Sequence, residues 1–288
     1  MMAHNLRYNL NQNMRRLDRI QTWLSTTQRI NKPSDDPTGI VNTLRYQSNI
    51  TEAEEYLKKI SEARNFINTT DSALANVTDI LHRASELTLQ GINGTSSEAA
   101  RGAIAAEIRQ LQDQIGVIAN TTYGSKYIFA GTNVTQAPLQ NGVWTGNDQS
   151  INLEIGAGTT VAVNSTIREL FFNPDPNNPG IYQLLEKTAS DLETGNQAEM
   201  NRDLEALQER LNGIVKERAI VGAKVNRLDL QENRLESTQI NYEELLSMNQ
   251  DADMAEVIMQ LKMQENVYRA SLAAGARIIM PSLVDFLR

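Results

Sequence analysis

Residues 29–37 read Arg-Ile-Asn-Lys-Pro-Ser-Asp-Asp-Pro and separate two long stretches of helical periodicity. Pro33 and Pro37 each fix their own φ angle and disfavour helix in the residue before them, so no single helix can pass through this segment. The Ser-Asp-Asp side chains between the two prolines can accept hydrogen bonds from free backbone amides. We therefore expect a turn here, with one of these three side chains capping a helix that begins near Pro37.

The two carboxylates of this turn, Asp35 and Asp36, could also serve acid–base chemistry or hold a cation. We favour the structural interpretation, because no histidine, cysteine or third carboxylate lies close to them in the sequence. The chain has no cysteine and only two histidines, which excludes disulfides and thiolate metal sites. It also lacks a phosphate-binding loop, a dinucleotide fingerprint and a His/Glu metal spacing. We expect no catalytic residue, no cofactor and no metal.

The composition limits the partners of the chain. Hydrophobic residues make up 40% of it and aromatic residues 5%, so the apolar content is aliphatic, which suits long helices. The net charge of -8 argues against nucleic acid as a partner, since binding to its backbone needs a basic face. Residues 1–32 are a local exception, because they hold six Arg or Lys side chains against one Asp and could meet an acidic partner or a membrane surface. No apolar run is long enough for a membrane span, and we expect no membrane partner.

The first helical stretch carries one narrow apolar stripe with steps of three and four residues. Its members are Ala3, Leu6, Leu10, Asn13, Leu17, Ile20, Leu24 and Thr27. Such a stripe is typical of a coiled-coil seam and needs a partner helix. Trp23 lies beside the stripe, where it can serve packing or, as an alternative, anchor a contact between subunits.

The last helical stretch has a similar stripe and also lacks a partner. Asp253, with Glu256, can cap this helix, and the stripe consists of Met254, Ile258, Leu261, Tyr268, Leu272 and Ile279. The simplest solution pairs the two stripes, with residues 3–30 antiparallel to residues 253–280. We expect Leu6, Leu10, Leu17, Leu24, Ile258, Leu261, Tyr268, Leu272 and Ile279 to carry assembly contacts.

Residues 38–137 contain no proline and predict two further helices. The first has two adjacent apolar lines, each with a period of seven: Ile60, Ile67, Leu74 and Leu81, and Phe66, Ala73, Ile80 and Leu87. A helix with two lines faces more than one neighbour, which indicates a bundle. A Gly-Ile-Asn-Gly break at 91–94 ends it, and Thr95 with Glu98 predicts a capping box for the next helix. That helix has the stripe Ile104, Ile108, Leu111, Ile115 and Ile118.

The composition changes in the middle of the chain. Residues 123–132 predict a short strand that ends at Gly131, and residues 134–179 hold four of the seven prolines. Apolar residues alternate at 151–155 and 161–163 around a Gly-Ala-Gly turn, which indicates a β-hairpin. We interpret 134–179 as a small β domain inserted between helices.

Helical periodicity returns near Ile181 and, after Gly195-Asn196, gives the longest repeat in the chain. Its seam is Leu204, Leu207, Leu211, Ile214, Arg218, Val221, Val225, Leu228, Glu232 and Leu235. The predicted fold is mainly α: a long antiparallel helical bundle or coiled-coil rod formed by the N- and C-terminal parts, with the inserted β domain. We divide it into a terminal coiled-coil stalk (1–36 with 250–288), a helical rod (37–133 with 180–249) and the insertion (134–179).

Several segments, in the same order, resemble the bacterial flagellin family. They are the turn 31–37, with Asn31, Pro33, Asp35 and Asp36; the Tyr-Ile-Phe-Ala-Gly-Thr segment at 127–132; the helical segment 221–228; and the closing residues 281–288. The turn and the closing residues are most similar to those family members that join the hook to the filament. One departure is the Thr27-Gln28 pair, which stands where the family commonly has a glycine and a basic residue, so the helix boundary between Leu24 and Lys32 stays open.

The resemblance implies a non-enzymatic structural adaptor of the bacterial flagellum that joins the hook-associated assembly to the filament. It implies contacts with another hook-associated junction protein and with flagellin, self-association into a ring, and an export chaperone on the C-terminal helix. It also implies an extracellular location, and the first residues contain no apolar run typical of a cleaved signal peptide. Because a narrow stripe cannot bury itself alone, we expect the terminal helices to be disordered in the free subunit and to order only on assembly. The alternatives are flagellin, the filament subunit itself, and a cytoplasmic coiled-coil scaffold.

Overall fold

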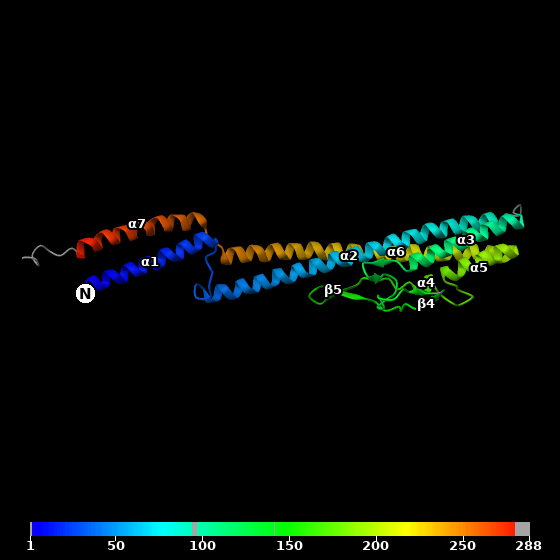
Figure 1. Cartoon of the computed structure of the whole chain (residues 1–288), viewed down its shortest axis with the longest axis horizontal. Coiled ribbons are helices and arrows are strands. Elements are labelled where there is room, and N and C mark those ends of the chain that lie inside the picture. Colours follow the sequence, from blue (N-terminus) through cyan, green and yellow to red (C-terminus); the bar gives the residue numbers. More distant parts are fainter. Residues whose placement is uncertain (1, 94–96, 141, 280–288) are drawn as a thin grey trace, which may run out of the picture. The chain divides into compact units, whose positions relative to one another are not determined.

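The structure is a computed structural model that describes residues 2–93, 97–140 and 142–279. Four long helices dominate it: α1 (Met2–Thr26), α2 (Pro37–Ile92), α6 (Gln197–Gln250) and α7 (Met254–Ile279). Shorter helices are α3 (Glu98–Ala119), α4 (Arg168–Phe171) and α5 (Ile181–Thr194), and six short strands lie between α3 and α4 (Figure 1). The predicted fold class, mainly α with a small β region, is confirmed.

The chain forms two compact units, and both α2 and α6 contribute to each of them. The smaller, terminal unit consists of residues 1–52 and 237–288, and the larger unit consists of residues 53–236. In the terminal unit, α1 lies side by side with α7, as the two unpartnered stripes predicted (Figure 1).

The larger unit has one continuous hydrophobic core. Both predicted lines of α2 are buried in it, and so is every second member of the α6 seam, from Leu207 to Leu235. The stripe of α3 is buried against the same core and against α5. Burial of each such Leu or Ile side chain stabilises the folded state by about 1.5–3 kcal/mol relative to leaving it exposed. Hydrophobic burial is therefore a large contribution to the stability of this unit.

The β region consists of three separate two-stranded antiparallel sheets. They are formed by β1 (Thr122–Tyr123) with β2 (Lys126–Tyr127), β3 (Leu139–Gln140) with β4 (Val143–Trp144), and β5 (Asn152–Gly156) with β6 (Thr159–Ala162). The predicted hairpin around residues 156–158 is confirmed, since Leu153 pairs with Val161 and a register shift occurs before Gly156.

Two local predictions are wrong. Residues 123–132 do not form one strand, because Gly124 has a φ of 59° and turns the chain directly back, so that Tyr123 pairs with Lys126. The helix α3 is capped by Ser97, whose hydroxyl accepts a hydrogen bond from the Ala100 amide, and Glu98 is already its first residue. Thr95, the predicted cap, lies outside the described residues.

The β region shares the core of the helices. Trp144, Ile155 and Phe171 belong to the same buried cluster as the α2 and α6 residues. Three side chains of α6 also donate hydrogen bonds to its backbone carbonyls: Lys224 to Asn164 (2.7 Å), Arg227 to Thr160 (3.0 Å) and Gln231 to Ile155 (3.3 Å). Burial lowers the pKa of Lys224. These contacts hold the insertion against α6.

Candidate functional site

The turn between α1 and α2 is held by its own carboxylates. Asp36 Oδ1 accepts hydrogen bonds from the amides of Thr38 (3.1 Å) and Gly39 (2.9 Å), and Pro37 is the first residue of α2, so the predicted cap is confirmed. Asp35 Oδ2 accepts from the backbone amides of residues 31 and 32, at 3.2 and 3.0 Å. Both carboxylates therefore stabilise the turn, in agreement with the structural interpretation.

The same turn is docked on the junction between α6 and α7. The Arg29 amide donates to the Gln250 carbonyl (2.7 Å), and the Ala252 amide donates to the Thr27 carbonyl (3.0 Å). Asn249 Nδ2 donates to the Gly39 carbonyl at 2.8 Å. Ile30, which is 1% exposed, fills the space beneath the turn. The N- and C-terminal parts of the chain are thus joined here by backbone contacts, and the partners lie more than 200 residues apart in the sequence.

Thr27 is the point where α1 stops. Its φ is 58°, and it is the only residue other than glycine with a positive φ in the described part of the chain. The left-handed region is sterically costly for a β-branched side chain and free of that cost for glycine. Thr27, which stands where the flagellin family commonly has glycine, therefore has a backbone conformation that glycine adopts more easily. The helix α1 ends at the preceding residue, Thr26.

The predicted seam residues of α1 lie at the contact with α7. Leu6, Leu10, Leu17 and Leu24 are half-buried and Ile20 is buried. Because α7 is the neighbour of α1, this part of the stripe faces it.

On α7 the predicted seam is partly wrong. Leu261 and Tyr268 are half-buried, but Ile258 is 49% exposed and Leu272 is 46% exposed. The less exposed line consists of Val257, Leu261, Gln264, Tyr268, Ser271 and Gly275. Apolar residues occupy two adjacent lines of this helix: the less exposed line and an outer line that contains Ile258 and Leu272. The less exposed line includes the polar residues Gln264 and Ser271, so the outer line was predicted to be the seam. The side chain of Ile279 lies outside the described residues.

A polar layer interrupts the contact between α1 and α7. Asn13 Nδ2 donates a hydrogen bond to Ser271 Oγ (3.2 Å), and Gln264 Nε2 donates to the Asn13 carbonyl (3.3 Å). Gln264 is only 8% exposed. A buried polar residue in a coiled-coil seam lowers stability but fixes the register, because any shift leaves it without a partner. At Gly275, a Cβ would lie 2.8 Å from Leu6 Cδ2, so the helices approach closely there.

The terminal unit exposes much of its apolar surface. On α7 the exposed side chains are Ile258, Met259, Met263, Val267 and Leu272; elsewhere in this unit they are Tyr8, Met14, Val41, Leu44, Ile240, Leu245 and Met248. The larger unit exposes fewer large apolar side chains although it is the longer one. Large exposed apolar patches mark interaction surfaces, and flexible methionines adapt to partners of different shape. This surface can bind other helices.

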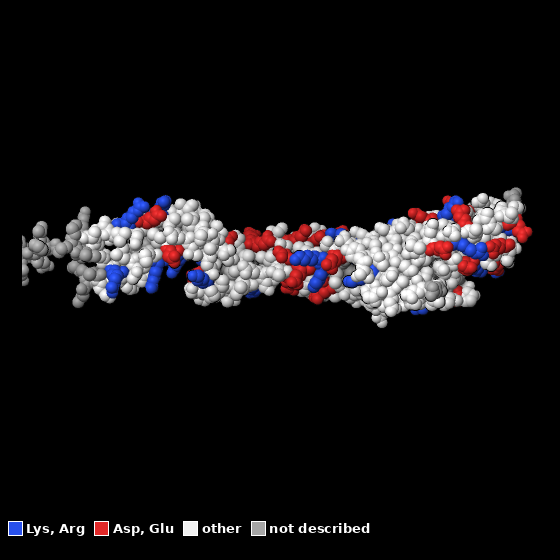
Figure 2. Space-filling view, in the orientation of Figure 1, with Lys and Arg blue, Asp and Glu red and all other residues white. Residues whose placement is uncertain are grey.

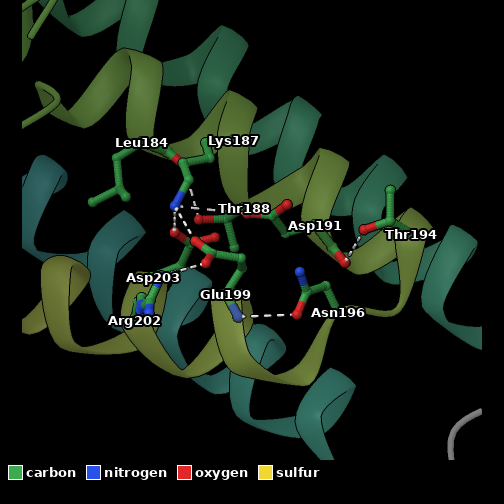
Figure 3. Close-up of polar contacts among 9 residues, drawn as sticks. All are labelled: Leu184, Lys187, Thr188, Asp191, Thr194, Asn196, Glu199, Arg202 and Asp203. Carbon is green, nitrogen blue, oxygen red and sulfur yellow. Dashed lines mark hydrogen bonds and ion pairs between the residues drawn. The ribbon is translucent and has the colours of Figure 1, made fainter. Parts of the chain in front are cut away.

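A charge cluster around the buried Asp203 joins α5 to α6 in the larger unit (Figure 3). Lys187 Nζ lies 2.8 Å from Asp203 Oδ1, 3.2 Å from Glu199 Oε2 and 3.7 Å from Asp191 Oδ2. Burial raises the pKa of Asp203 to about 6, against the opposite effect of Lys187. Burial alone would lower the pKa of Lys187, but the hydrogen bond and charge of Asp203 outweigh it and raise that pKa.

This cluster binds two helices together. Within the described residues, no group of three or more His, Asp or Glu side chains is placed to hold a metal ion. The ammonium group of Lys187 is itself the cation among these carboxylates. In the same part of the chain, no helix combines the length and the apolar character needed to cross a membrane.

Comparison with known proteins gives matches over most of the chain. The bacterial flagellin N-terminal helical region matches residues 1–134, and the bacterial flagellin C-terminal helical region matches residues 204–287. The flagellar hook-associated protein 3 of Escherichia coli is 25% identical and covers 91% of this chain and 92% of its own length. A flagellin of Halalkalibacterium halodurans is 26% identical, with coverage of 96% and 92%.

The fold is similar to that of solved hook-associated proteins. The structure of a flagellar hook-associated protein from Vibrio parahaemolyticus aligns with a TM-score of 0.70 at 19% identity, covering 75% of this chain and 99% of that one. Together, the two flagellin regions match well over half of the sequence, on both sides of the β region. The chain belongs to the bacterial flagellin family.

Proposed function

We propose that this chain is a non-enzymatic structural subunit of the bacterial flagellum that joins the hook-associated assembly to the filament. The observation that carries the proposal is the terminal unit, in which α1 and α7 pair through a narrow, partly polar contact and leave apolar side chains exposed. A surface of this kind suits a subunit that is completed by its neighbours. The name of the E. coli relative, flagellar hook-associated protein 3, supports the junction rather than the filament.

The second candidate is flagellin itself, the subunit of the filament. It is favoured by the similarity to the Halalkalibacterium halodurans flagellin, which is as high as the similarity to the hook-associated relative. The two candidates differ in position and number: a junction subunit is confined to the base of each filament, and a filament subunit is distributed along its whole length.

The proposal includes specific partners. They are another hook-associated junction protein on one side, flagellin on the other, further copies of this chain in a ring, and an export chaperone that covers α7 in the cytoplasm. The exposed Met259, Met263 and Val267 support an α7 partner, since they are spaced by four residues and leave an apolar surface of that helix uncovered. The nine predicted assembly residues and the turn residues 31–36 are proposed to act within these contacts.

The proposal also assigns roles to the parts of the chain. Residues 1–36 with 250–288 form the stalk, which orders on assembly; residues 37–133 with 180–249 form the rod; and residues 134–179 form the insertion. The small buried area of a narrow polar seam supports a stalk that is unstable in the free chain. Amide hydrogen exchange on the dilute protein tests this, and strong protection of residues 3–30 would contradict it.

Deletion of the gene tests the function. We expect cells with hooks but without filaments, and unpolymerised flagellin in the medium; electron microscopy and motility assays measure both. The full-length gene should restore filaments, and a copy that lacks residues 253–288 should not. Normal filaments on the deletion strain would refute the junction function, and labelling of the protein along entire filaments would favour flagellin.

A further inference from the structure

A basic crevice lies in the terminal unit, between α1, the turn and α7. Three adjoining hollows in this unit all share Arg19 and Trp23 in their walls. Around these two residues the walls carry the side chains of Arg15, Arg16, Arg29 and Lys32. We use the term basic crevice for these six residues. Figure 2 shows that Lys and Arg predominate along α1.

The positive charge of the basic crevice exceeds the negative charge that lines the same hollows. No ion pair between described residues includes any of its five cations. Arg29 donates to a backbone carbonyl, that of Asn249, at 3.2 Å. Three carboxylates, Asp18, Asp35 and Asp36, also line the hollows against the five cations, and the last two already accept backbone amide hydrogen bonds of the turn. The crevice can therefore bind an anionic group without losing an existing ion pair.

Trp23 defines what else the occupant must contain. The side chain is only half-buried, in the middle of the hollows. Tryptophan and arginine are the residue types most enriched among those that dominate binding energy at protein interfaces. An indole surrounded by guanidinium groups fits a segment that combines carboxylates with an apolar side chain.

The chain itself presents such a segment. On α6, Ile240, Glu243, Glu244 and Met248 follow the spacing i, i+3, i+4, i+8, which places them on one face of the helix. All four are exposed, Ile240 by 63% and Met248 by 72%. Glu243 accepts a hydrogen bond only from its own helix, from Gln239 Nε2 at 2.9 Å. We use the term acidic strip for these four residues.

We propose that the basic crevice of one copy of this chain binds the acidic strip of a second copy. The partner is a copy of the same chain because the two surfaces are complementary in charge and each carries an apolar element. Such a contact joins two different surfaces, so it continues from copy to copy and closes into a ring if the rotation allows. The inference deepens the proposed function, on which it rests, by naming the surfaces through which subunits of the assembly meet.

Sedimentation of the purified full-length protein at rising concentration tests the contact, because the stalk that forms the crevice is proposed to order as copies associate. We expect concentration-dependent self-association that weakens as salt rises, because exposed charges are screened. The crevice variant Arg15→Glu/Arg19→Glu and the strip variant Glu243→Arg/Glu244→Arg should each associate at least about tenfold more weakly. The matched control is Arg7→Glu, an exposed arginine on α1 outside the crevice, which should associate like the wild type.

Mixing the two charge variants gives a sharper test. Each variant keeps one intact surface, and the two reversed surfaces are also opposite in charge, so an equimolar mixture should regain the association that each variant alone has lost. A chain that carries all four reversals should regain self-association, which also guards against loss through misfolding. A monomeric wild type at all concentrations, or a crevice variant that associates like the wild type, would overturn the proposal.

A cysteine cross-link provides an independent measurement. The chain has no cysteine, so Arg19→Cys in one copy and Glu244→Cys in another can form no intramolecular disulfide. When the two variants are mixed under a mild added oxidant, their mixed disulfide, resolved from the disulfides between identical copies, reports this contact. We expect this pair to cross-link and the pair Arg7→Cys with Glu244→Cys to remain unlinked; equal yields from both pairs would refute the contact. Normal filaments on the deletion strain overturn the proposed function alone, and filamentless hooks together with a monomeric wild type overturn the contact alone.

Discussion

Replacing Thr27 with glycine should stabilise the terminal unit. The residue has a φ of 58°, and a left-handed conformation costs an L-residue about 1–2 kcal/mol. Glycine removes this cost but adds about 0.5–1 kcal/mol of backbone entropy to the unfolded chain. The exposed side chain contributes little packing, and its carbonyl still accepts the Ala252 amide hydrogen bond. The expected net gain is about 0.5–1 kcal/mol.

Trp23 provides the assay, because it lies in the terminal unit near the turn. The only other tryptophan, Trp144, is buried in the larger unit and can be replaced by phenylalanine to leave Trp23 as the reporter. Urea unfolding followed by Trp23 fluorescence should shift to higher concentration in Thr27→Gly. Thr27→Ala is the matched control, since it removes the hydroxyl but keeps a Cβ and should gain less. Equal or lower stability of the glycine variant relative to the alanine variant would refute the assignment of strain to Thr27.

Three further changes test the turn, the polar layer and the charge cluster. Asp36→Ala removes the acceptor of two amides at the start of α2 and should lower stability by about 1 kcal/mol in thermal unfolding, whereas Asp35→Glu should have a smaller effect. Gln264→Leu should make the pairing of α1 with α7 tighter but less specific in register, which cysteine pairs placed along the two helices would report as several cross-linked registers instead of one. Asp203 has a folded-state pKa raised to about 6 from an ordinary value of 3.8, so between these values the folded state keeps a proton that the unfolded state has lost. Its contribution to stability therefore falls as the pH rises through that window, by no more than about 3 kcal/mol, and urea unfolding of Asp203→Asn from pH 4 to 7 should lack this fall.

The larger unit was predictable because its pattern has one interpretation. Along α2 and α6 the apolar residues are mostly aliphatic, spaced by three and four, and separated by polar positions, so the buried helix face is specified at every turn. The turn at 29–37 was also predictable, since two prolines disfavour helix and the aspartates between them are side chains that cap helices and close turns.

The terminal unit was less predictable for a physical reason. On α7, Val257 and Ile258 are adjacent apolar residues, and sequence alone does not decide which of them faces α1. The choice is made by Gln264 and Ser271, which find Asn13 across the contact, and a hydrogen bond between residues about 250 positions apart leaves no local signal. The prediction of one strand at 123–132 was wrong for a similar reason. The turn between β1 and β2 depends on the positive φ of Gly124, which the periodicity of the sequence does not show.

The two units differ in how much of their stability each can supply alone. In the larger unit, the buried lines of three helices and the β region close one core, and cations at its edge are paired, as Arg218 is with Asp71 and Lys187 with Asp203. In the terminal unit, a narrow seam contains a polar layer, and α1 ends at a threonine with a left-handed backbone. No ion pair between described residues includes a cation of the basic crevice. Each of these features costs stability in a single chain and is offset only if another surface covers the apolar side chains and brings opposite charge. These features would not help a protein that functions alone. In a subunit they keep the free chain from associating too tightly before assembly, and they make the contacts specific once assembly has occurred.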